Sequence, residues 1–151
     1  MKAAILPWII VLLALPAAAA DDPARAPDDP VLQQARTAVG RGDFPAAAAV
    51  LREALAKSAD NVEYHNLYAY ALRKGPAPDW DLVFKHYHEA LRLDPKHRGA
   101  HEYIGEAYLS VGNLPKAKEH LARLDGLCFF GCREYSELKK AVQAYEAKLK
   151  R

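Results

Sequence analysis

The stretch that decides the fold is residues 101–124, which reads HEYIGEAYLSVGNLPKAKEHLARL. Its first half carries packing residues at intervals of one, three and four, which is the spacing of one helical face. That face consists of His101, Ile104, Gly105 and Tyr108. The segment Gly112-Asn113-Leu114-Pro115 interrupts the pattern, and proline is favourable in the first turn of a following helix. The stretch therefore predicts two helices joined by a tight turn.

Units of this kind recur along the chain. Small residues stand 34 and then 36 residues apart at Ala35, Ala69 and Gly105. A second series stands 36 and then 34 residues apart at Ala54, Ala90 and Leu124. The two longer intervals overlap only between Ala69 and Ala90, so two extra residues lie there, where the cluster GPAPD at 75–79 breaks the helical pattern. We expect three helix–turn–helix units, at about residues 28–61, 62–97 and 98–128.

A closing helix is predicted over residues 134–150. Its apolar residues form one stripe, made of Leu138, Ala141, Val142, Tyr145 and Leu149. A polar outer side on the last helix is what a helical stack needs to stay soluble. Because strand signals are absent from the sequence, the predicted fold is all-α, with one helical domain over residues 31–151.

Residues 101–124 resemble one unit of the tetratricopeptide-repeat (TPR) family. The matching positions are Gly105, Gly112 and Ala117. Residues 90–97, ALRLDPKH, resemble the usual end of such a unit, and the resemblance extends over about residues 28–124. Unit one departs from the family pattern at Val31, Gln34 and Ala38, where the family usually has larger apolar residues. The resemblance implies a right-handed superhelix of stacked helix pairs, with a concave face lined by the first helix of each pair.

Helical spacing indicates which side chains would face that concave surface. They are Leu32, Arg36, Val39, Asn66, Tyr70, Arg73, Glu102, Glu106 and Leu109. The predicted partner-binding residues are the six polar or aromatic ones, Arg36, Asn66, Tyr70, Arg73, Glu102 and Glu106. An extended peptide would gain hydrogen bonds from Asn66 and stacking on Tyr70, and the open alternative is that these are solvated side chains without a ligand. Glu102 and Glu106 would repel a C-terminal carboxylate, so the carboxylate clamp of some family members is not expected.

The N-terminus has the layout of a secretory signal peptide. Lys2 is followed by an uncharged apolar run over residues 3–15, then by Pro16 and the small residues 18–20. An uncleaved membrane anchor is the alternative, but a run this short barely reaches the roughly 20 residues that a bilayer core requires. We expect cleavage after Ala20, no membrane span in the mature chain, a flexible leader over residues 21–30, and a periplasmic or secreted location.

The charge pattern restricts the class of partner. The formal net charge is +2, with both signs mixed along the chain. Nucleic-acid binding would favour a one-sided basic stripe, which this pattern does not provide. We therefore expect a protein or peptide partner, with self-association also possible.

Two cysteines, Cys128 and Cys132, frame the sequence Cys-Phe-Phe-Gly-Cys. In an exported protein such a pair favours a disulfide, here one that fixes the angle between unit three and the closing helix. We expect Phe129 and Phe130 to be tucked under it. The spacing fits neither a thioredoxin-type pair nor a haem attachment site, and a reactive thiol pair stays open as the alternative.

The six histidines do not predict a metal site. His65 and His101 occupy matching places in their units, where a packing role is favoured, and His86 and His88 point to different sides of one helix. Zinc requires three or four converging ligands, and no such spacing is present. The sequence also lacks a nucleophile elbow, a P-loop and a dinucleotide-binding glycine run. We therefore expect no metal, no cofactor, no catalytic residue and no enzyme activity.

Together these patterns predict a protein–protein interaction module, an adaptor or scaffold of the bacterial cell envelope. A bacterial envelope is favoured over eukaryotic secretion because the sequence has no N-x-S/T glycosylation site. The alternative is a periplasmic redox or metal-handling accessory that uses the Cys128/Cys132 pair.

Overall fold

The structure is a computed structural model that describes residues 29–150. Within that range the chain forms seven helices and no strand. The helices are α1 (Pro30–Gly40), α2 (Phe44–Lys57), α3 (Val62–Lys74), α4 (Trp80–Leu93), α5 (Arg98–Ser110), α6 (Leu114–Leu127) and α7 (Arg133–Leu149). These are three helix pairs and a closing helix, so the predicted all-α repeat architecture is confirmed.

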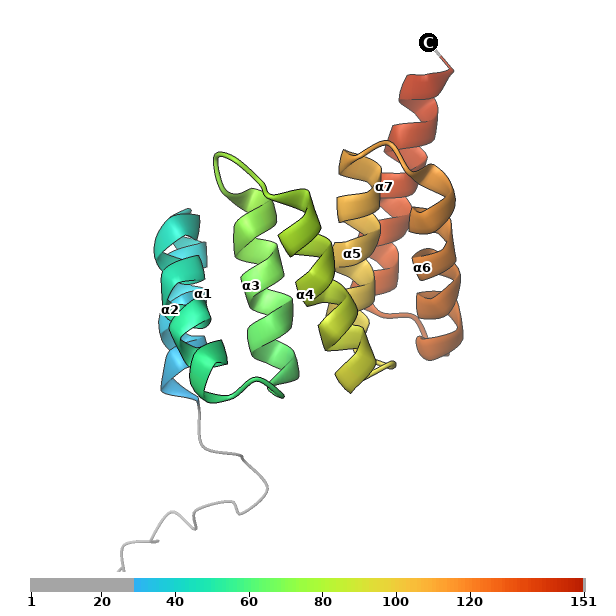
Figure 1. The fold of residues 1–151 in the computed structure, drawn as a ribbon. Helices are drawn as coiled ribbons and strands as arrows, with labels where there is room; N and C mark the ends of the chain where they lie inside the picture. The colour runs from blue at the N-terminus through green and yellow to red at the C-terminus, as the bar shows by residue number, and fades with distance from the viewer. Residues whose placement is uncertain (1–28, 151) are drawn as a thin grey trace, which may run out of the picture.

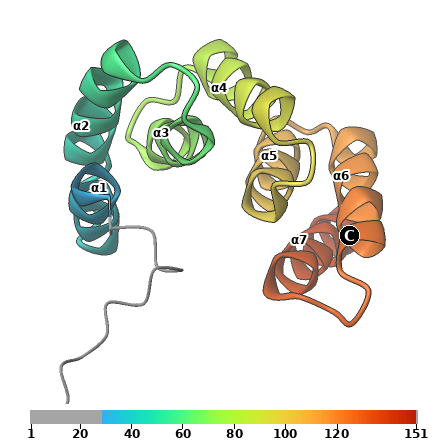
Figure 2. The ribbon, with the colours of Figure 1, turned by 90° about the horizontal axis from the view of Figure 1, so that it is seen from below.

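The helices stack into a curved solenoid with an inner and an outer layer. Figure 2 shows α1, α3, α5 and α7 along the inside of an arc and α2, α4 and α6 along its outside. Figure 1 shows the successive pairs side by side in chain order, with the C-terminus at the far end of α7. The inner helices therefore form a concave face, as the repeat pattern predicts.

Local sequence accounts for the start of each helix. In α1 the carboxylate of Asp29 accepts hydrogen bonds from the backbone N–H groups of Val31, at 2.9 Å, and Leu32, at 3.2 Å. Such caps satisfy donors that have no partner within the helix. The capping residues of the seven helices are Asp29, Asp43, Asn61, Asp79, His97, Asn113 and Cys132.

Two matching turns separate the helices of units one and three. Gly42 and Gly112 have φ angles of 74° and 80°, a region that glycine adopts without strain. Pro45 and Pro115 follow in the first turn of the next helix, where a proline loses no intrahelical hydrogen bond. Unit two replaces this turn with the longer GPAPD segment, as the offset between the two residue series indicates.

The core consists of four clusters of buried residues, and partly buried side chains such as Leu72 and Tyr108 pack against two clusters each. The small residues that revealed the repeat, Ala35, Ala69 and Gly105, are all buried. At Gly105 a Cβ atom would lie 2.6 Å from Cδ2 of Leu138 on α7, which is closer than real Cβ contacts come. The largest fully buried side chains include Tyr87, Leu51 and Ile104. Small residues thus allow neighbouring inner helices to approach closely.

The predicted leader is two residues too long. Pro30 is the first residue of α1, and Asp29 both caps that helix and accepts a 2.7 Å hydrogen bond from the Tyr64 hydroxyl on α3. These two residues therefore belong to the fold. The predicted signal peptide over residues 1–20 and the rest of the leader lie outside the described residues. Of the helices over residues 29–150, none is long and apolar enough to cross a membrane.

Candidate functional site

The concave face carries a polar cavity of about 510 Å³ between α1, α3, α5 and the start of α7. We call this cavity the groove. It is lined by Arg36, Glu63, Asn66, Leu67, Asp94, Lys96, His97, Arg98, Gly99, Tyr103, Arg133 and Glu134. Four arginine or lysine residues face three acidic residues there, so the groove has a small excess of positive charge. Two of the six predicted partner-binding residues, Arg36 and Asn66, line it.

A chain of polar contacts joins the inner helices along one rim of the groove. Glu63 on α3 lies 3.5 Å from the Arg36 guanidinium on α1 and 2.9 Å from Nε2 of His97 at the start of α5. Nδ1 of His97 accepts the backbone N–H of Ala100 at 2.9 Å, so its Nε2 carries the proton that is donated to Glu63. This hydrogen bond is the main reason that the pKa of Glu63 lies below its ordinary value. The Arg36 side chain is 60% exposed, so it stays accessible from the groove although it is paired with Glu63.

The prediction that Asn66 and Glu102 are free is wrong. These residues, 36 positions apart in consecutive repeats, are only 5% and 3% exposed. Leu32, at the corresponding place in unit one, is buried as well. The physical reason is the close approach of neighbouring inner helices, which covers the part of each helix nearest its neighbour.

Both buried polar side chains nevertheless have an oxygen without a hydrogen-bond donor. These atoms are Oδ1 of Asn66 and Oε2 of Glu102. The nearest charge to Glu102 is the Arg133 guanidinium at 3.5 Å, and the Arg133 side chain is itself 64% exposed. Burial raises the pKa of Glu102 to about 7. Unpaired buried acceptors are uncommon because each loses its hydrogen bonds to water.

The remaining predicted residues form a cluster further along the concave face. Arg73 on α3 donates a 2.7 Å hydrogen bond to Glu106 on α5, and the Arg73 side chain is only 9% exposed. The same guanidinium lies 5.4 Å from the ring centre of Tyr70, which packs against Tyr103 at 4.8 Å. Arg73 is therefore not free as predicted, since it neutralises Glu106. The predicted repulsion of an anionic ligand by Glu106 is correspondingly weakened.

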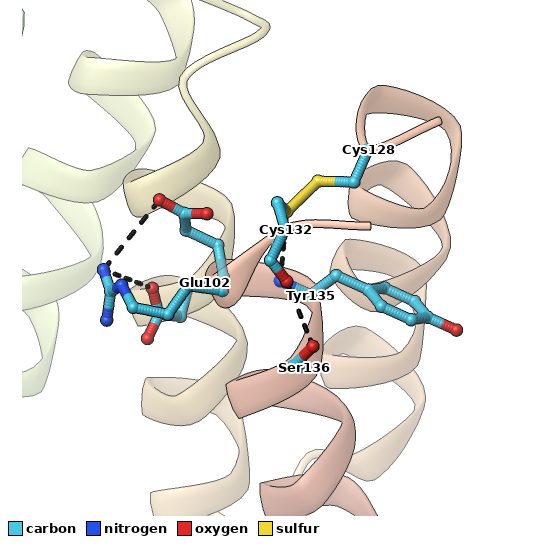
Figure 3. Close-up of a disulfide and its surroundings, with 7 residues drawn as sticks. Glu102, Cys128, Cys132, Tyr135 and Ser136 are labelled. Atoms are coloured by element: carbon cyan, nitrogen blue, oxygen red, sulfur yellow. Dashed lines mark hydrogen bonds and ion pairs between the residues drawn. A yellow bond between two sulfur atoms is a disulfide. The ribbon is translucent and has the colours of Figure 1, made fainter. Parts of the chain in front are cut away.

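The cysteine pair closes the end of the solenoid beside the groove. Cys128 and Cys132 form a disulfide that joins the end of α6 to the start of α7 (Figure 3). Sγ of Cys132 also accepts the backbone N–H of Tyr135 at 3.4 Å, so this residue caps α7. Figure 3 shows Glu102 on α5 close to this start of α7.

The expected position of the two phenylalanines is wrong. Phe129 and Phe130 are not tucked under the disulfide but are 89% and 98% exposed. Cys128 is buried against the core, so the short segment between the two cysteines arches outward and carries both rings into solvent.

The histidines form two matching pairs between helices. Nδ1 of His65 lies 2.8 Å from Nδ1 of His86, and Nδ1 of His101 lies 2.9 Å from Nδ1 of His120. Nε2 of His65 and of His101 each donates to a backbone carbonyl, so the protons between the rings come from His86 and His120. The predicted packing role of His65 and His101 matches this geometry. Across the part of the chain that the structure describes, no group of three or more His, Cys, Asp or Glu residues could hold a metal ion.

Sequence reasoning missed Glu63, His97, Tyr103 and Arg133 as groove residues. The repeat register could have identified two of these places, Glu63 and Tyr103, because each stands 36 residues from another groove residue, Gly99 and Leu67 respectively. The same register relates the two histidine pairs. Arg133 carried no comparable signal, since it belongs to the closing helix rather than to a repeat.

Comparisons with known proteins agree with this architecture. A family model of the tetratricopeptide repeat matches residues 32–79. An Arabidopsis thaliana protein, inactive TPR repeat-containing thioredoxin TTL3, is 31% identical over 116 residues, which cover 74% of this chain and 15% of that protein. The chain therefore spans only a small part of the length of this relative.

Three solved structures share the fold. The type III secretion translocator chaperone SycD of Yersinia enterocolitica has a TM-score of 0.67 at 15% identity, over 81% of this chain and 85% of that one. The first TPR domain of human RPAP3 has a TM-score of 0.65 at 19% identity, over 80% and 93%. The first TPR of Spaghetti (RPAP3), bound to the HSP90 peptide SRMEEVD, has a TM-score of 0.63 at 18% identity, over 77% and 93%.

Proposed function

The chain belongs to the tetratricopeptide-repeat family, and from this premise we propose that it is an exported adaptor of the bacterial cell envelope that binds an extended segment of a partner protein in its groove. The signal-peptide pattern of residues 1–20 supports export, and the Cys128–Cys132 disulfide is compatible with an oxidising compartment. The likeness to a TPR domain that holds an HSP90 peptide supports a peptide as the ligand.

One observation carries the binding proposal. Asn66 lines the groove, and its Oδ1 is a buried acceptor without a donor. Glu102, at the equivalent position of the next repeat, has such an oxygen behind Arg133, which does line the groove. After a turn of the Asn66 side chain toward the groove, a backbone N–H or a polar side chain of a bound segment would supply the missing hydrogen bond, which is worth most in a partly desolvated site. This unpaired acceptor supports a ligand that carries hydrogen-bond donors, as an extended peptide does.

The exposed charges of the groove add selectivity. Arg36, Arg98 and Lys96 are exposed at its rim, and the carboxylate of Glu63 is already paired with His97. An acidic side chain in the bound segment would meet these cations, which increases the association rate more than the final affinity. We expect partners whose bound segment is extended and mildly acidic.

In-cell photo-crosslinking tests the proposal. A photo-reactive residue replaces Arg36 in the groove or, as the control, Lys85, which is exposed on the outer helix α4. We expect an adduct with another protein from position 36 and not from position 85. Equal adducts from both positions, or none from position 36, would refute binding in the groove.

Cell fractionation tests the export part separately. We expect the chain in the periplasmic or secreted fraction with Asp21 as its first residue. A chain recovered from the cytosol with residues 1–20 still attached would refute export and would leave the groove proposal to the crosslinking result.

A further inference from the structure

Glu102 is an acidic side chain that is buried beside the groove. Its side chain is only 4% exposed, and no donor in the described residues forms a hydrogen bond with its Oε2. The guanidinium of Arg133 lies 3.5 Å from that oxygen, which is longer than the roughly 2.7–3.2 Å of an N–H···O hydrogen bond. A buried carboxylate without hydrogen bonds is costly when it is ionised. The surroundings of Glu102 therefore favour its neutral, protonated form.

Arg133 joins Glu102 to the groove. It lines the groove, its side chain is 64% exposed, and it is the first residue of α7, directly after the disulfide residue Cys132. A second carboxylate, that of Glu134, lies 3.9 Å from the same guanidinium. Both contacts are too long for hydrogen bonds, so these two acids do not occupy the planar set of N–H donors with which an arginine binds a carboxylate at two points. Arg133 can therefore bind a third carboxylate that enters from the groove.

The protonation state of Glu102 sets the charge around Arg133. Two other acids that act on Glu102 are already paired with cations, in the ion pairs Glu106–Arg73 and Glu137–Lys140. Tyr103 is uncharged near neutral pH, because burial raises its pKa above the ordinary 10. When Glu102 is ionised, two carboxylates share Arg133, and an approaching anion meets a net negative charge. When Glu102 is protonated, only Glu134 balances Arg133, and that repulsion is removed.

Proton binding at Glu102 and anion binding at Arg133 are coupled. Burial raises the pKa of Glu102 to about 7, and repulsion from the neighbouring acids adds to this, whereas Arg133 opposes it. An anion that draws Arg133 toward the groove weakens the attraction that favours ionised Glu102, so it raises this pKa further. Because linkage is reciprocal, protonated Glu102 must favour the bound anion by the same factor. Anion binding is therefore strongest below pH 7 and weakens as the pH rises through 7.

We propose that Glu102 and Arg133 form a proton-coupled binding site of the groove, in which a carboxylate of the partner segment binds Arg133 while Glu102 takes up a proton from solvent. The inference rests on the proposed function and deepens it, because it adds the group that the groove recognises and the condition that regulates binding. The partner segment then carries an acidic side chain where it passes the start of α7. Binding forms no covalent bond and transfers one proton from water to the Glu102 carboxylate.

The size of the pH dependence follows from the protonated fraction of Glu102. The apparent dissociation constant equals the intrinsic constant divided by the fraction of molecules in the competent form. For a pKa of about 7, Glu102 is protonated in about 0.9 of the molecules at pH 6 and in about 0.1 at pH 8. If only the protonated form binds, an acidic segment binds about tenfold more weakly at pH 8. Acidic side chains of a flexible peptide have pKa values of about 4, so the segment itself is ionised at both pH values.

Fluorescence anisotropy of the purified chain, with its disulfide intact, tests the proposal at pH 6 and pH 8. The probe is a rhodamine-labelled peptide in which glutamate alternates with glycine, and the reference probe has glutamine in place of glutamate. We expect the wild type to bind the acidic probe about tenfold more weakly at pH 8 than at pH 6. Glu102→Gln, which keeps a neutral side chain of the same shape, should bind at both pH values as the wild type does at pH 6. Arg133→Gln should bind weakly at both.

Two other groove residues provide the controls. Arg98→Gln removes another exposed arginine of the groove, so it should weaken binding at both pH values but keep the tenfold ratio between them. His97 is a second titratable groove residue, and its hydrogen bond to Glu63 raises its pKa. Because His97 is the same in the wild type and in Glu102→Gln, the pH ratio of the first divided by that of the second isolates Glu102.

Carbon-13 NMR of the Glu102 carboxyl group measures the coupling without a ligand. We expect its midpoint near pH 7 in the wild type and at higher pH in Arg133→Gln, since the cation that favours ionised Glu102 is then absent. A midpoint near the ordinary 4.5, or one that Arg133→Gln leaves unchanged, would overturn the proposal.

Three binding results would also overturn it. They are equal pH ratios for the wild type and Glu102→Gln, which would assign the dependence to His97; a tenfold ratio that persists in Arg133→Gln; and an acidic probe that binds no better than the glutamine probe at pH 6. The proposed function is tested apart from these, because crosslinking from position 36 detects a partner whatever side chain that partner carries. An adduct from position 36 without the pH ratio would keep the groove as the binding site and refute only the role of Glu102.

Discussion

Substitution of Gly105 by alanine should destabilise the chain, although alanine is the better helix former. Gly105 lies in α5 where α7 crosses it, and a Cβ atom there would lie 2.6 Å and 2.8 Å from the two terminal carbons of Leu138. Leu138 is fully buried, so its side chain cannot turn away into solvent. The added methyl group must displace either Leu138 or α7.

The size of the effect follows from two opposing terms. Alanine in a helix interior gains about 1 kcal/mol over glycine. Overpacking a filled core costs about 1–3 kcal/mol, and contacts below 3 Å with a fully buried leucine favour the upper half of that range. We therefore expect Gly105→Ala to lower the free energy of unfolding by about 1–2 kcal/mol.

Gly126→Ala is the matched control because it makes the same chemical change where a Cβ atom meets nothing within 4 Å. It should raise the free energy of unfolding by about 0.5 kcal/mol, since Gly126 lies near the end of α6. Urea unfolding followed by circular dichroism, with the disulfide intact, measures both variants. Shifts in the same direction, or an unchanged midpoint for Gly105→Ala, would refute the inference that close contact of α5 and α7 requires glycine.

Three further outcomes are expected from the same unfolding measurements. Arg73→Ala should lower the free energy of unfolding by about 1–3 kcal/mol, because it leaves the Glu106 carboxylate without its partner. Adding Glu106→Gln should recover part of that stability, and no recovery would contradict this reason. Cys128→Ser/Cys132→Ser should lower the free energy of unfolding by about 2 kcal/mol, because the five-residue loop no longer restricts the unfolded chain. A variant as stable as the wild type would contradict this expectation. Glu102 has a folded pKa of about 7, above its ordinary 4.5, so its protonated form stabilises the fold below about pH 4.5 and this contribution is lost as the pH rises through 7. Glu102→Gln should therefore exceed the wild type in stability by little at pH 5 and by an amount on the order of 2–3 kcal/mol at pH 8, and a pH-independent difference would refute the buried carboxylate. His86 and His120, with pKa values of about 4, affect both proteins alike and cancel in this difference.

The sequence predicted the groove only in part. Arg36 and Asn66 were placed on the concave side correctly, because helical spacing determines which residues share a face. The pairing of Arg73 with Glu106 and the contact of Arg133 with Glu102 join residues on different helices. Such contacts depend on the distance between helices, which spacing along one helix does not specify.

Helix positions and repeat register follow from local rules and could be read along the chain. Neighbouring residues within each unit determine caps such as Asp43 and the turn glycines Gly42 and Gly112. The 34- and 36-residue intervals between small residues are visible directly in the sequence. Exposure was decided only by tertiary structure. Packing of neighbouring inner helices buries Asn66 and Glu102, whereas Phe129 and Phe130, in the loop that the disulfide closes, lie in solvent. A residue's chemistry and its helical face are local properties, but the area that its neighbours cover depends on how closely distant segments approach.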